Sequence, residues 1–327
     1  MAEENRGGTL GPAAPDVREH PLVAVVGPTG SGKSDLALAI AEEYNGELVN
    51  CDSVQVFRYF DIGSAKTPAA DRQGIPHHLI DIADPDALFT AGEYARLARQ
   101  TIAEITARGR LPVVVGGTGF YLRALLDGLF EGPTRDQGLR DRLAAREARR
   151  PGSLHRLLRR FDREAAAKIH RNDVPKVTRA VEVCLLTRRP VSELFREGRD
   201  ALRGYATLKL GLLPDRDALY DRVNVRCERM FAEGLVEEVR RIEAMGYGAA
   251  KPFESVGYKQ ALQVVRGELS ADDALLSAQR DTRNYAKRQI TWFRREAGLI
   301  WLRGFGDDPA IRADALSRVK VFAERFR

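Results

Sequence analysis

Residues 27–34, with the sequence GPTGSGKS, constrain the fold more than any other part of this chain. They fit the P-loop pattern G-x-x-x-x-G-K-[ST]. The β-branched run LVAVV at 22–26 precedes them, and the helical pattern LALAIAEEY follows them. Between a strand and a helix, such glycines let consecutive backbone N–H groups surround phosphate oxygens at the positive end of the helix. The segment therefore predicts a polyphosphate site, without specifying ATP.

Each residue of this segment has a predicted part in holding phosphate. The predicted phosphate-binding residues are Gly27, Pro28, Thr29, Gly30, Ser31, Gly32, Lys33 and Ser34. Lys33 would supply a positive point charge, and the hydroxyl of Ser34 would bind Mg²⁺. The alternative, a glycine turn with an incidental lysine, does not account for the strand and helix on either side.

Strand and helix signals alternate through the first part of the chain. After the strand at 22–26, the runs ELVNCD and LPVVV predict two further strands, and helical patterns separate them. This alternation is typical of a parallel α/β sheet, which binds ligands at the carboxyl ends of its strands. A lone strand candidate, TLKLGLL, returns at 207–213.

Arginine-rich helical patterns replace the strand signals between about residue 133 and residue 200. Residues 131–200 contain 18 Lys or Arg and 11 Asp or Glu, a net charge of +7. The whole chain carries +6, so the rest of it carries −1. By itself, such a concentration fits a solvated helical face as well as a nucleic-acid-binding surface.

We therefore predict an α/β fold in which a P-loop parallel sheet, flanked by helices, forms the core and a helical insertion domain interrupts it. The first twenty residues are rich in Gly, Pro, Ala and charge, which is typical of disorder. The predicted division is a disordered tail at 1–20, the first part of the core at 21–130, the basic insertion at 131–200 and the mostly helical rest of the core at 201–327.

The sequence offers no sign of a membrane, a disulfide framework or an obligate protein partner. No apolar run reaches the roughly 18 to 20 residues of a membrane span, and the N-terminal residues lack the apolar stretch of a signal peptide. We therefore expect a cytoplasmic protein. Cys51, Cys184 and Cys227 are widely spaced, so neither a disulfide framework nor a zinc ribbon is supported.

Two predicted strands end in polar groups suited to chemistry. Asp52 ends ELVNCD, where a carboxylate would act as a general base or an orienting acceptor. Thr118 follows the glycines after LPVVV. Each residue has the alternative role of capping the next segment. Since LPVVV does not end in the Asp that holds Mg²⁺ in P-loop ATPases and kinases, a nucleotide-hydrolysing function is less favoured.

Two later segments combine positive charge with helical spacing. Arg222 and Arg226, four residues apart, lie on one helix face, where they would clamp a diphosphate together or simply be solvated. In RNYAKRQ at 283–289, cations surround an aromatic residue. This pattern fits phosphate contacts with base stacking, and equally a helix that packs Tyr285 and Trp292 inward.

The ordered motifs of the chain resemble those of the bacterial tRNA dimethylallyltransferases. They are GPTGSGKS, NCDSVQVFR, IGSAK, GIPHHLID, VVVGGTGFYLRAL, RNDVPKVTRAVEV, LYDRVNVRCERMFAEGLVEEV and YAKRQITWFRR, and they cover about residues 22–300. The resemblance implies transfer of the dimethylallyl group of dimethylallyl diphosphate to N6 of the adenine 3′ of the anticodon in tRNA, with Mg²⁺ as cofactor.

The resemblance also implies roles for single residues. The P-loop would bind the diphosphate, with Ser34 as the metal ligand. The implied catalytic residues are Thr29, Asp52, Arg222 and Arg226. The implied contacts to the tRNA anticodon stem-loop are Asp52, Ser53, Val54, Gln55, Thr118, Arg140, Lys176 and Arg179. Asp52 would face the adenine amine, and the basic insertion would clamp the RNA around an extruded base.

Two other functions stay open at this point. An adenylate isopentenyltransferase would prenylate a free adenine nucleotide, but such enzymes need no large helical insertion, so the basic residues 131–200 count against it. A nucleotide-dependent RNA-binding switch would bind ATP or GTP and would leave Asp52 without a catalytic role.

Overall fold

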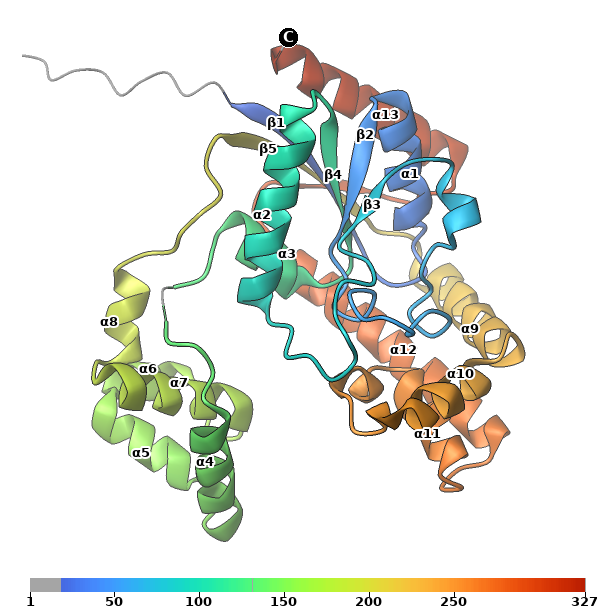
Figure 1. The fold of residues 1–327 in the computed structure, drawn as a ribbon. Helices are drawn as coiled ribbons and strands as arrows, with labels where there is room; N and C mark the ends of the chain where they lie inside the picture. Colours follow the sequence, from blue (N-terminus) through green and yellow to red (C-terminus); the bar gives the residue numbers. More distant parts are fainter. Residues whose placement is uncertain (1–18, 131, 327) are drawn as a thin grey trace, which may run out of the picture. The chain divides into compact units, whose positions relative to one another are not determined.

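The computed structural model describes residues 19–130 and 132–326, which form two compact units (Figure 1). Unit 1 comprises the chain up to residue 89, residues 97–121 and the chain from residue 203 onward. Unit 2 comprises residues 90–96 and 122–202. The predicted tail at 1–20 lies outside the described residues, apart from its last two.

A six-stranded sheet forms the centre of unit 1. Its strands are β1 (His20–Val26), β2 (Gly46–Asn50), β3 (His77–His78), β4 (Leu111–Gly116), β5 (Tyr205–Leu212) and β6 (Leu299–Leu302), in the spatial order β3-β2-β4-β1-β5-β6. Every pairing is parallel, so the carboxyl ends of the strands meet at one edge. The predicted parallel α/β fold is confirmed. The short strands β3 and β6 lie outside the predicted strands, because two and four residues produce little periodicity.

The sheet is buried on both faces, as a parallel sheet requires. β1 lies between β4 and β5, and Val23 and Val25 pack into a cluster with α1 (Lys33–Glu43) and α13 (Pro309–Ala323). Figure 1 shows these two helices side by side on one face of the sheet. On the other face lies α2 (Ala91–Ala107), whose Thr106 contacts Tyr205 of β5.

Four helices from the second half of the chain complete unit 1. They are α9 (Arg216–Ala232), α10 (Leu235–Ile242), α11 (Tyr258–Val265) and α12 (Ala271–Phe293), with short helical turns at Ala69–Arg72, Glu243–Tyr247, Lys251–Glu254 and Glu324–Phe326. Phe60, in the loop after β2, packs against Phe253 and Tyr258. Helices that are distant in sequence therefore hold the loop that follows β2.

Unit 2 is helical. The chain enters it through α3 (Gly119–Leu126), and its other helices are α4 (Gln137–Arg149), α5 (Ser153–Phe161), α6 (Arg163–Lys168), α7 (Val174–Thr187) and α8 (Val191–Arg196). Aspartates cap the N-termini of α4, α6 and α7, which is why these helices begin where they do. The residues predicted as an insertion, 131–200, fall in this unit. Across the described parts of both units, no helix is long and apolar enough to cross a membrane.

Candidate active site

The P-loop residues 27–34 turn tightly between β1 and α1 at the carboxyl edge of the sheet. Gly30 and Gly32 have φ values of 79° and 78°, in the left-handed region that favours glycine. A Cβ on Gly32 would also lie 2.9 Å from the backbone nitrogen of Gly306, in a loop packed against the turn. No side chain caps α1, so its first N–H groups are available to an anion at the positive end of the helix.

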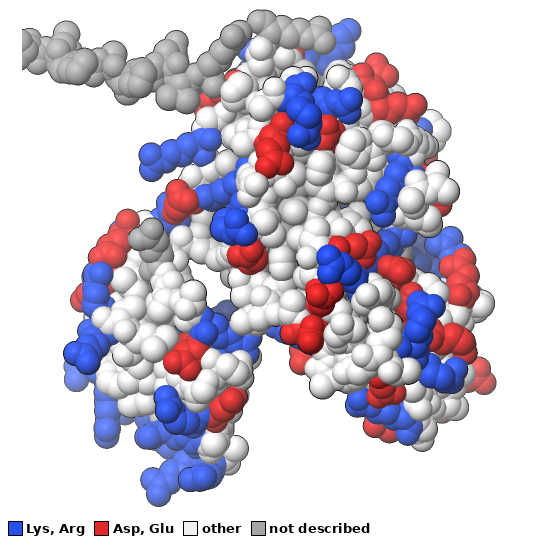
Figure 2. All heavy atoms as spheres, viewed as in Figure 1, with Lys and Arg blue, Asp and Glu red and all other residues white. Residues whose placement is uncertain are grey.

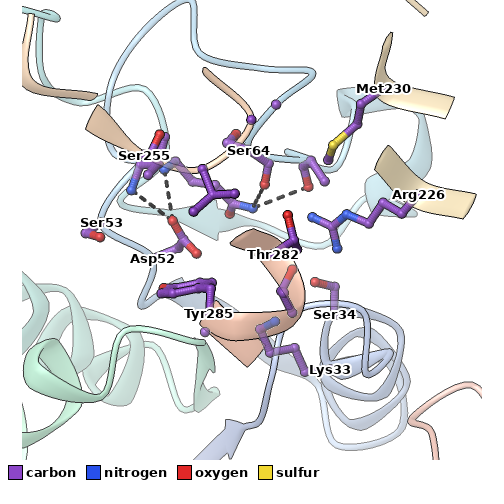
Figure 3. A pocket seen from close by; sticks show the side chains of 18 of the residues that line it. Lys33, Ser34, Asp52, Ser53, Ser64, Arg226, Met230, Ser255, Thr282 and Tyr285 are labelled. Atoms are coloured by element: carbon purple, nitrogen blue, oxygen red, sulfur yellow. Dashed lines mark hydrogen bonds between the residues drawn. The ribbon is translucent and has the colours of Figure 1, made fainter. Parts of the chain in front are cut away.

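A cavity of about 350 Å³ adjoins this turn within unit 1 (Figure 3). Lys33 and Ser34 come from α1, Asp52 follows β2, Arg226 comes from α9 and Tyr285 from α12, and all five line the cavity. Two cations beside the P-loop and the carboxylate of Asp52 therefore share a single space. Such an arrangement suits a transfer between two substrates. The cations would stabilise a departing phosphate group, and the carboxylate would act as a base toward the second substrate.

The two cations at the cradle have perturbed acidities. Lys33 Nζ donates to the backbone oxygen of Pro28 at 3.3 Å. Burial and the nearby charge of Arg226 lower the pKa of Lys33 to about 8, against an opposing effect of Asp52. Burial likewise lowers the pKa of Arg226. Because a bound polyanion favours the charged form of both groups, the site is electrostatically suited to diphosphate.

The two oxygens of Asp52 have different surroundings. Oδ1 accepts from the backbone N–H of Val54 at 2.8 Å and of Gln55 at 3.3 Å (Figure 3). Within the described chain, Oδ2 accepts no hydrogen bond. One oxygen therefore caps the loop and the other remains available to a substrate, so the capping role is observed and the catalytic role stays a prediction.

The strand ends that carry Asp52 and Thr118 are joined by hydrogen bonds. Thr118 Oγ1 accepts from the backbone N–H of Ser53 at 3.0 Å and lies 3.3 Å from Ser53 Oγ. Gln55 lines the cavity, but its amide also donates to the backbone oxygens of Ser64 and Ala65 at 3.0 and 3.3 Å. Ser53 and Val54 line the cavity too.

Glu238 stabilises the loop that follows β2. This side chain is 2% exposed, and it accepts from the backbone N–H groups of Asp61 and Ile62 and from the hydroxyl of Tyr258 at 2.6 Å. Burial raises the pKa of Glu238, against the effect of these hydrogen bonds. The position of the loop thus depends on a glutamate that lies within the motif LYDRVNVRCERMFAEGLVEEV but was given no role there.

The two arginines of the predicted pair, Arg222 and Arg226, have different surroundings. Arg226 lines the main cavity together with Lys33 and Ser34. Arg222 instead forms an ion pair with Asp307 and stacks over the ring of Phe305, with Cζ 3.7 Å from the ring centre. Both arginines line a second, open hollow of about 470 Å³ beside the P-loop. The geometry favours Arg226 for the main cavity.

Two of the predicted RNA-contacting arginines in unit 2 have a buried partner. Glu182 is fully buried and accepts from Arg140 Nε at 2.9 Å and Nη2 at 2.8 Å, and from Arg179 Nη1 at 2.8 Å. Lys176 is exposed and pairs with Asp173 at 2.5 Å. Arg140 therefore joins α4 to α7, whereas Arg179 pairs with Glu182 within α7 and donates to the backbone oxygen of Pro133 at 2.9 Å. Contact of either arginine with RNA stays a prediction.

Figure 2 shows Lys and Arg side chains gathered over the part of the molecule that contains α4 and α5. There, Arg159, Arg160 and Arg163 line an open hollow of about 630 Å³. Among the described residues of unit 2, these three side chains form no ion pair and no hydrogen bond. They are therefore the arginines of this hollow that remain available to an anion.

Mg²⁺ would fit this cavity as an ion bound mainly by the phosphate oxygens of a substrate, and not as an ion bound by protein ligands alone. The described residues contain no cluster of three or more His, Cys, Asp or Glu side chains that would hold a metal. Ser34 is exposed at the start of α1 and supplies a hydroxyl oxygen. Mg²⁺ characteristically binds through few protein oxygens, retained waters and substrate phosphates, which is consistent with this site.

The structure also adds residues to the site. Gln289, which is 5% exposed, contacts both the P-loop and the turn after β4, and residues 255–257 and Thr282 line the main cavity. Tyr285 is half-buried and lines the cavity, so stacking of a base on its ring stays a prediction. Tyr285 and Gln289 are four residues apart, a spacing that predicts two side chains on the same face of a helix.

Comparison with known proteins places these features in a family. A family model described as IPP transferase matches residues 55–296. A tRNA dimethylallyltransferase of Solibacter usitatus is 72% identical over 303 residues, which are 92% of this chain and 99% of that protein. A tRNA dimethylallyltransferase of Koribacter versatilis is 54% identical over 301 residues, 92% of this chain and 98% of that protein.

Solved structures agree with these sequence matches. A tRNA isopentenylpyrophosphate transferase from Bacillus halodurans has a TM-score of 0.70 and 36% identity, covering 94% of this chain and 97% of its own. A eukaryotic dimethylallyltransferase acting on tRNA has a TM-score of 0.78 and 26% identity, covering 92% of this chain and 79% of its own.

Proposed function

The chain belongs to the IPP transferase family, and on that premise we propose that it is a tRNA dimethylallyltransferase. It transfers the dimethylallyl group of dimethylallyl diphosphate to N6 of the adenine 3′ of the anticodon and releases diphosphate. We place this reaction in the cytoplasm, with the tRNA anticodon stem-loop as the macromolecular substrate. The observation that supports the proposal most directly is the single cavity in which the P-loop and Asp52 lie together.

The proposed reaction exchanges one bond for another. The bond between C1 of the allyl group and the diphosphate oxygen breaks, and its electron pair leaves with the diphosphate. A bond forms between C1 and the adenine N6, which loses one proton. The amine is a weak nucleophile because its lone pair is delocalised into the ring, so a base that accepts this proton contributes typically about 10²–10⁴-fold in rate.

The P-loop residues 27–34 would hold the diphosphate. The N–H groups at the start of α1, Lys33 and Arg226 stabilise the negative charge that grows on the leaving oxygen. Mg²⁺, held by the phosphate oxygens and the Ser34 hydroxyl, would add further charge stabilisation. Thr29 lines the same cavity and would orient the diphosphate end of the substrate.

Asp52 would face the adenine through Oδ2. Because Oδ1 is already occupied by two backbone N–H groups, the carboxylate is fixed in orientation before the substrate binds. Ser53 and Thr118, joined to each other, would contact the RNA around the extruded base. Unit 2, with its exposed arginines, would bind the RNA backbone.

A transfer assay tests the proposal against its rivals. Unmodified tRNA, free AMP and an RNA stem-loop without the target adenine are each incubated with the protein, Mg²⁺ and dimethylallyl diphosphate, and the nucleosides are analysed by mass spectrometry. We expect one added C5 unit on tRNA adenine only. Prenylated AMP would favour an adenylate isopentenyltransferase. Thermal stabilisation by ATP or GTP without any transfer would favour a nucleotide-dependent switch.

A further inference from the structure

Gln289 of α12 uses both halves of its amide to join two loops of the site. Its Oε1 accepts from the backbone N–H of Thr29 at 2.8 Å, and its Nε2 donates to the backbone oxygen of Gly117 at 2.9 Å. The side chain is 5% exposed. A backbone N–H on one side and a carbonyl on the other demand an acceptor and a donor, so only one orientation of the amide satisfies both.

Each end of this bridge leads to a different half of the proposed reaction. Thr29 belongs to the phosphate cradle and follows Pro28, whose carbonyl accepts from Lys33 Nζ. Gly117 precedes Thr118, which accepts from the N–H of Ser53 beside Asp52. The amide of Gln289 therefore spans the distance between the leaving-group half and the acceptor half of the cavity.

The bridge is held closely in place. A Cβ added to Gly117 would lie 2.2 Å from Gln289 Nε2, so the turn after β4 packs directly against the amide. Tyr285, one helical turn earlier on α12, lines the same cavity as Thr29 and Gln289. The helix α12 thus places Gln289 between the two loops and Tyr285 beside it on the cavity wall.

From this geometry we infer that Gln289 is a positioning residue for the transfer reaction, an inference that rests on the proposed function. It sets the separation of the phosphate cradle from the acceptor site, without touching the reacting atoms. Transfer between two substrates requires their reacting atoms to be aligned at contact distance, and a displacement of about 1 Å costs roughly 10²-fold in rate.

Gln289→Glu is the most discriminating variant. A neutral carboxylic acid has one C=O acceptor and one O–H donor, so it reproduces the bridge, whereas a carboxylate cannot donate to Gly117. Burial favours the neutral acid, so its pKa rises above the ordinary value of about 4.3. The single-turnover rate relative to the unmodified protein should therefore increase as pH falls from about 8.5 toward 5.5.

The pH comparison is designed as a ratio. Lys33, Asp52, Arg226, Tyr285 and Arg288 line the same cavity and are present in both proteins. Their own titrations consequently cancel to first order when the variant rate is divided by the unmodified rate at each pH. Gln100→Glu, an equivalent change at an exposed position of α2, is the matched control and should give a flat ratio of about one.

Gln289→Met removes both hydrogen bonds at nearly constant volume. We expect a single-turnover rate at saturating substrates that is lower by about 10²-fold at every pH. The dissociation constants of dimethylallyl diphosphate and of an anticodon stem-loop, each measured alone, should change by less than about threefold, because each half-site remains. Melting temperature is recorded on the same samples.

Three results would overturn the inference. The first is a rate ratio for Gln289→Glu that does not vary with pH. The second is a Gln289→Met protein that melts earlier but transfers normally. The third is a Gln289→Met protein that loses only stem-loop affinity, which would make Gln289 an RNA contact. Failure of the proposed function is distinct, since the unmodified protein would then transfer nothing to tRNA.

Discussion

Asp307 holds Arg222 beside the phosphate cradle, with Arg222 Nη1 2.7 Å from Oδ1 and 3.0 Å from Oδ2. The side chains are 44% and 43% exposed, and the pair lowers the pKa of Asp307. Arg226, one helical turn further along α9, lines the main cavity with Lys33. Two arginines that the sequence treats as equivalent therefore have different partners.

Arg226→Ala should weaken binding of dimethylallyl diphosphate more than Arg222→Ala does. Losing a hydrogen bond to a charged group costs roughly 1.5–3 kcal/mol, which is about 10- to 150-fold in affinity. Arg222 already has a carboxylate partner, so its removal should change affinity by less than about threefold. Titration of labelled substrate measures both. Equal losses in the two variants would contradict the division of roles.

Binding of dimethylallyl diphosphate should weaken as pH rises through about 8. Lys33 is charged below its pKa, which burial and Arg226 lower to about 8. Above that pH the free protein holds a neutral lysine, and the anion must bind together with a proton. Affinity measured across this range should fall for the unmodified protein. Lys33→Arg should remain flat, because arginine stays protonated.

Asp52→Asn should retain the fold and lose the chemistry. The asparagine oxygen still accepts from the N–H groups of Val54 and Gln55, so the melting temperature should change little. The amide nitrogen replaces Oδ2, which removes the proton acceptor, and the single-turnover rate should drop by about 10²–10⁴-fold. A variant that melts early and transfers at the normal rate would reduce Asp52 to a cap.

Glu182 should stabilise unit 2 against acid. Burial by itself would raise its pKa, but hydrogen bonds from Arg140, Arg179 and the N–H of Asp136 outweigh it and lower the pKa from 4.5 to about 2. A carboxyl whose folded pKa is depressed stabilises the fold above its unfolded pKa. This contribution should therefore be complete above pH 4.5 and lost as pH falls toward 2.

Glu182→Gln should consequently destabilise unit 2 by roughly 3 kcal/mol at neutral pH, because it leaves two arginines without a counter-charge. The difference should vanish near the bottom of that pH range. Trp292 and Trp301 both lie in unit 1, so amide hydrogen exchange of α7 is the appropriate measurement. Glu193→Gln, on an exposed ion pair, is the control and should change little. An equal effect at all pH values would contradict the prediction.

Removing the arginines at 159, 160 and 163 together should reduce the salt dependence of tRNA binding. Each phosphate contact contributes about 0.7 to 0.9 to the slope of log K against log salt, so the triple alanine variant should lose roughly 2 units of slope. Filter binding at increasing salt measures it, while dimethylallyl diphosphate affinity serves as a readout of unit 1 and should not change.

A triple alanine variant on the C-terminal helices provides the matched control for charge. Its positions are the exposed arginines Arg312, Arg318 and Arg325. The loss of positive charge is the same, so a uniform electrostatic effect would lower the slope equally in both variants. Equal slopes would therefore contradict a phosphate-binding role for the hollow in unit 2.

The amino-acid sequence by itself determined the features that depend on neighbouring residues. The predicted phosphate site at residues 27–34 requires glycines, a lysine and a following helix, all within one short segment. The parallel sheet follows from buried β-branched runs that alternate with helices, and Asp52 follows one of those runs. These patterns are local, so they can be recognised in the sequence without knowledge of the rest of the fold.

Only the tertiary structure decided which of these side chains share a space. Arg222 turns to Asp307, 85 residues away, and the bridge from Gln289 to Thr29 spans 260 residues. Arg140 and Arg179, which look like free cations in the sequence, are committed to buried Glu182. The physical reason is that the contacts of a charged or amide side chain depend on which hydrogen-bonding partners lie near it. Partners distant in sequence come near only when the chain folds.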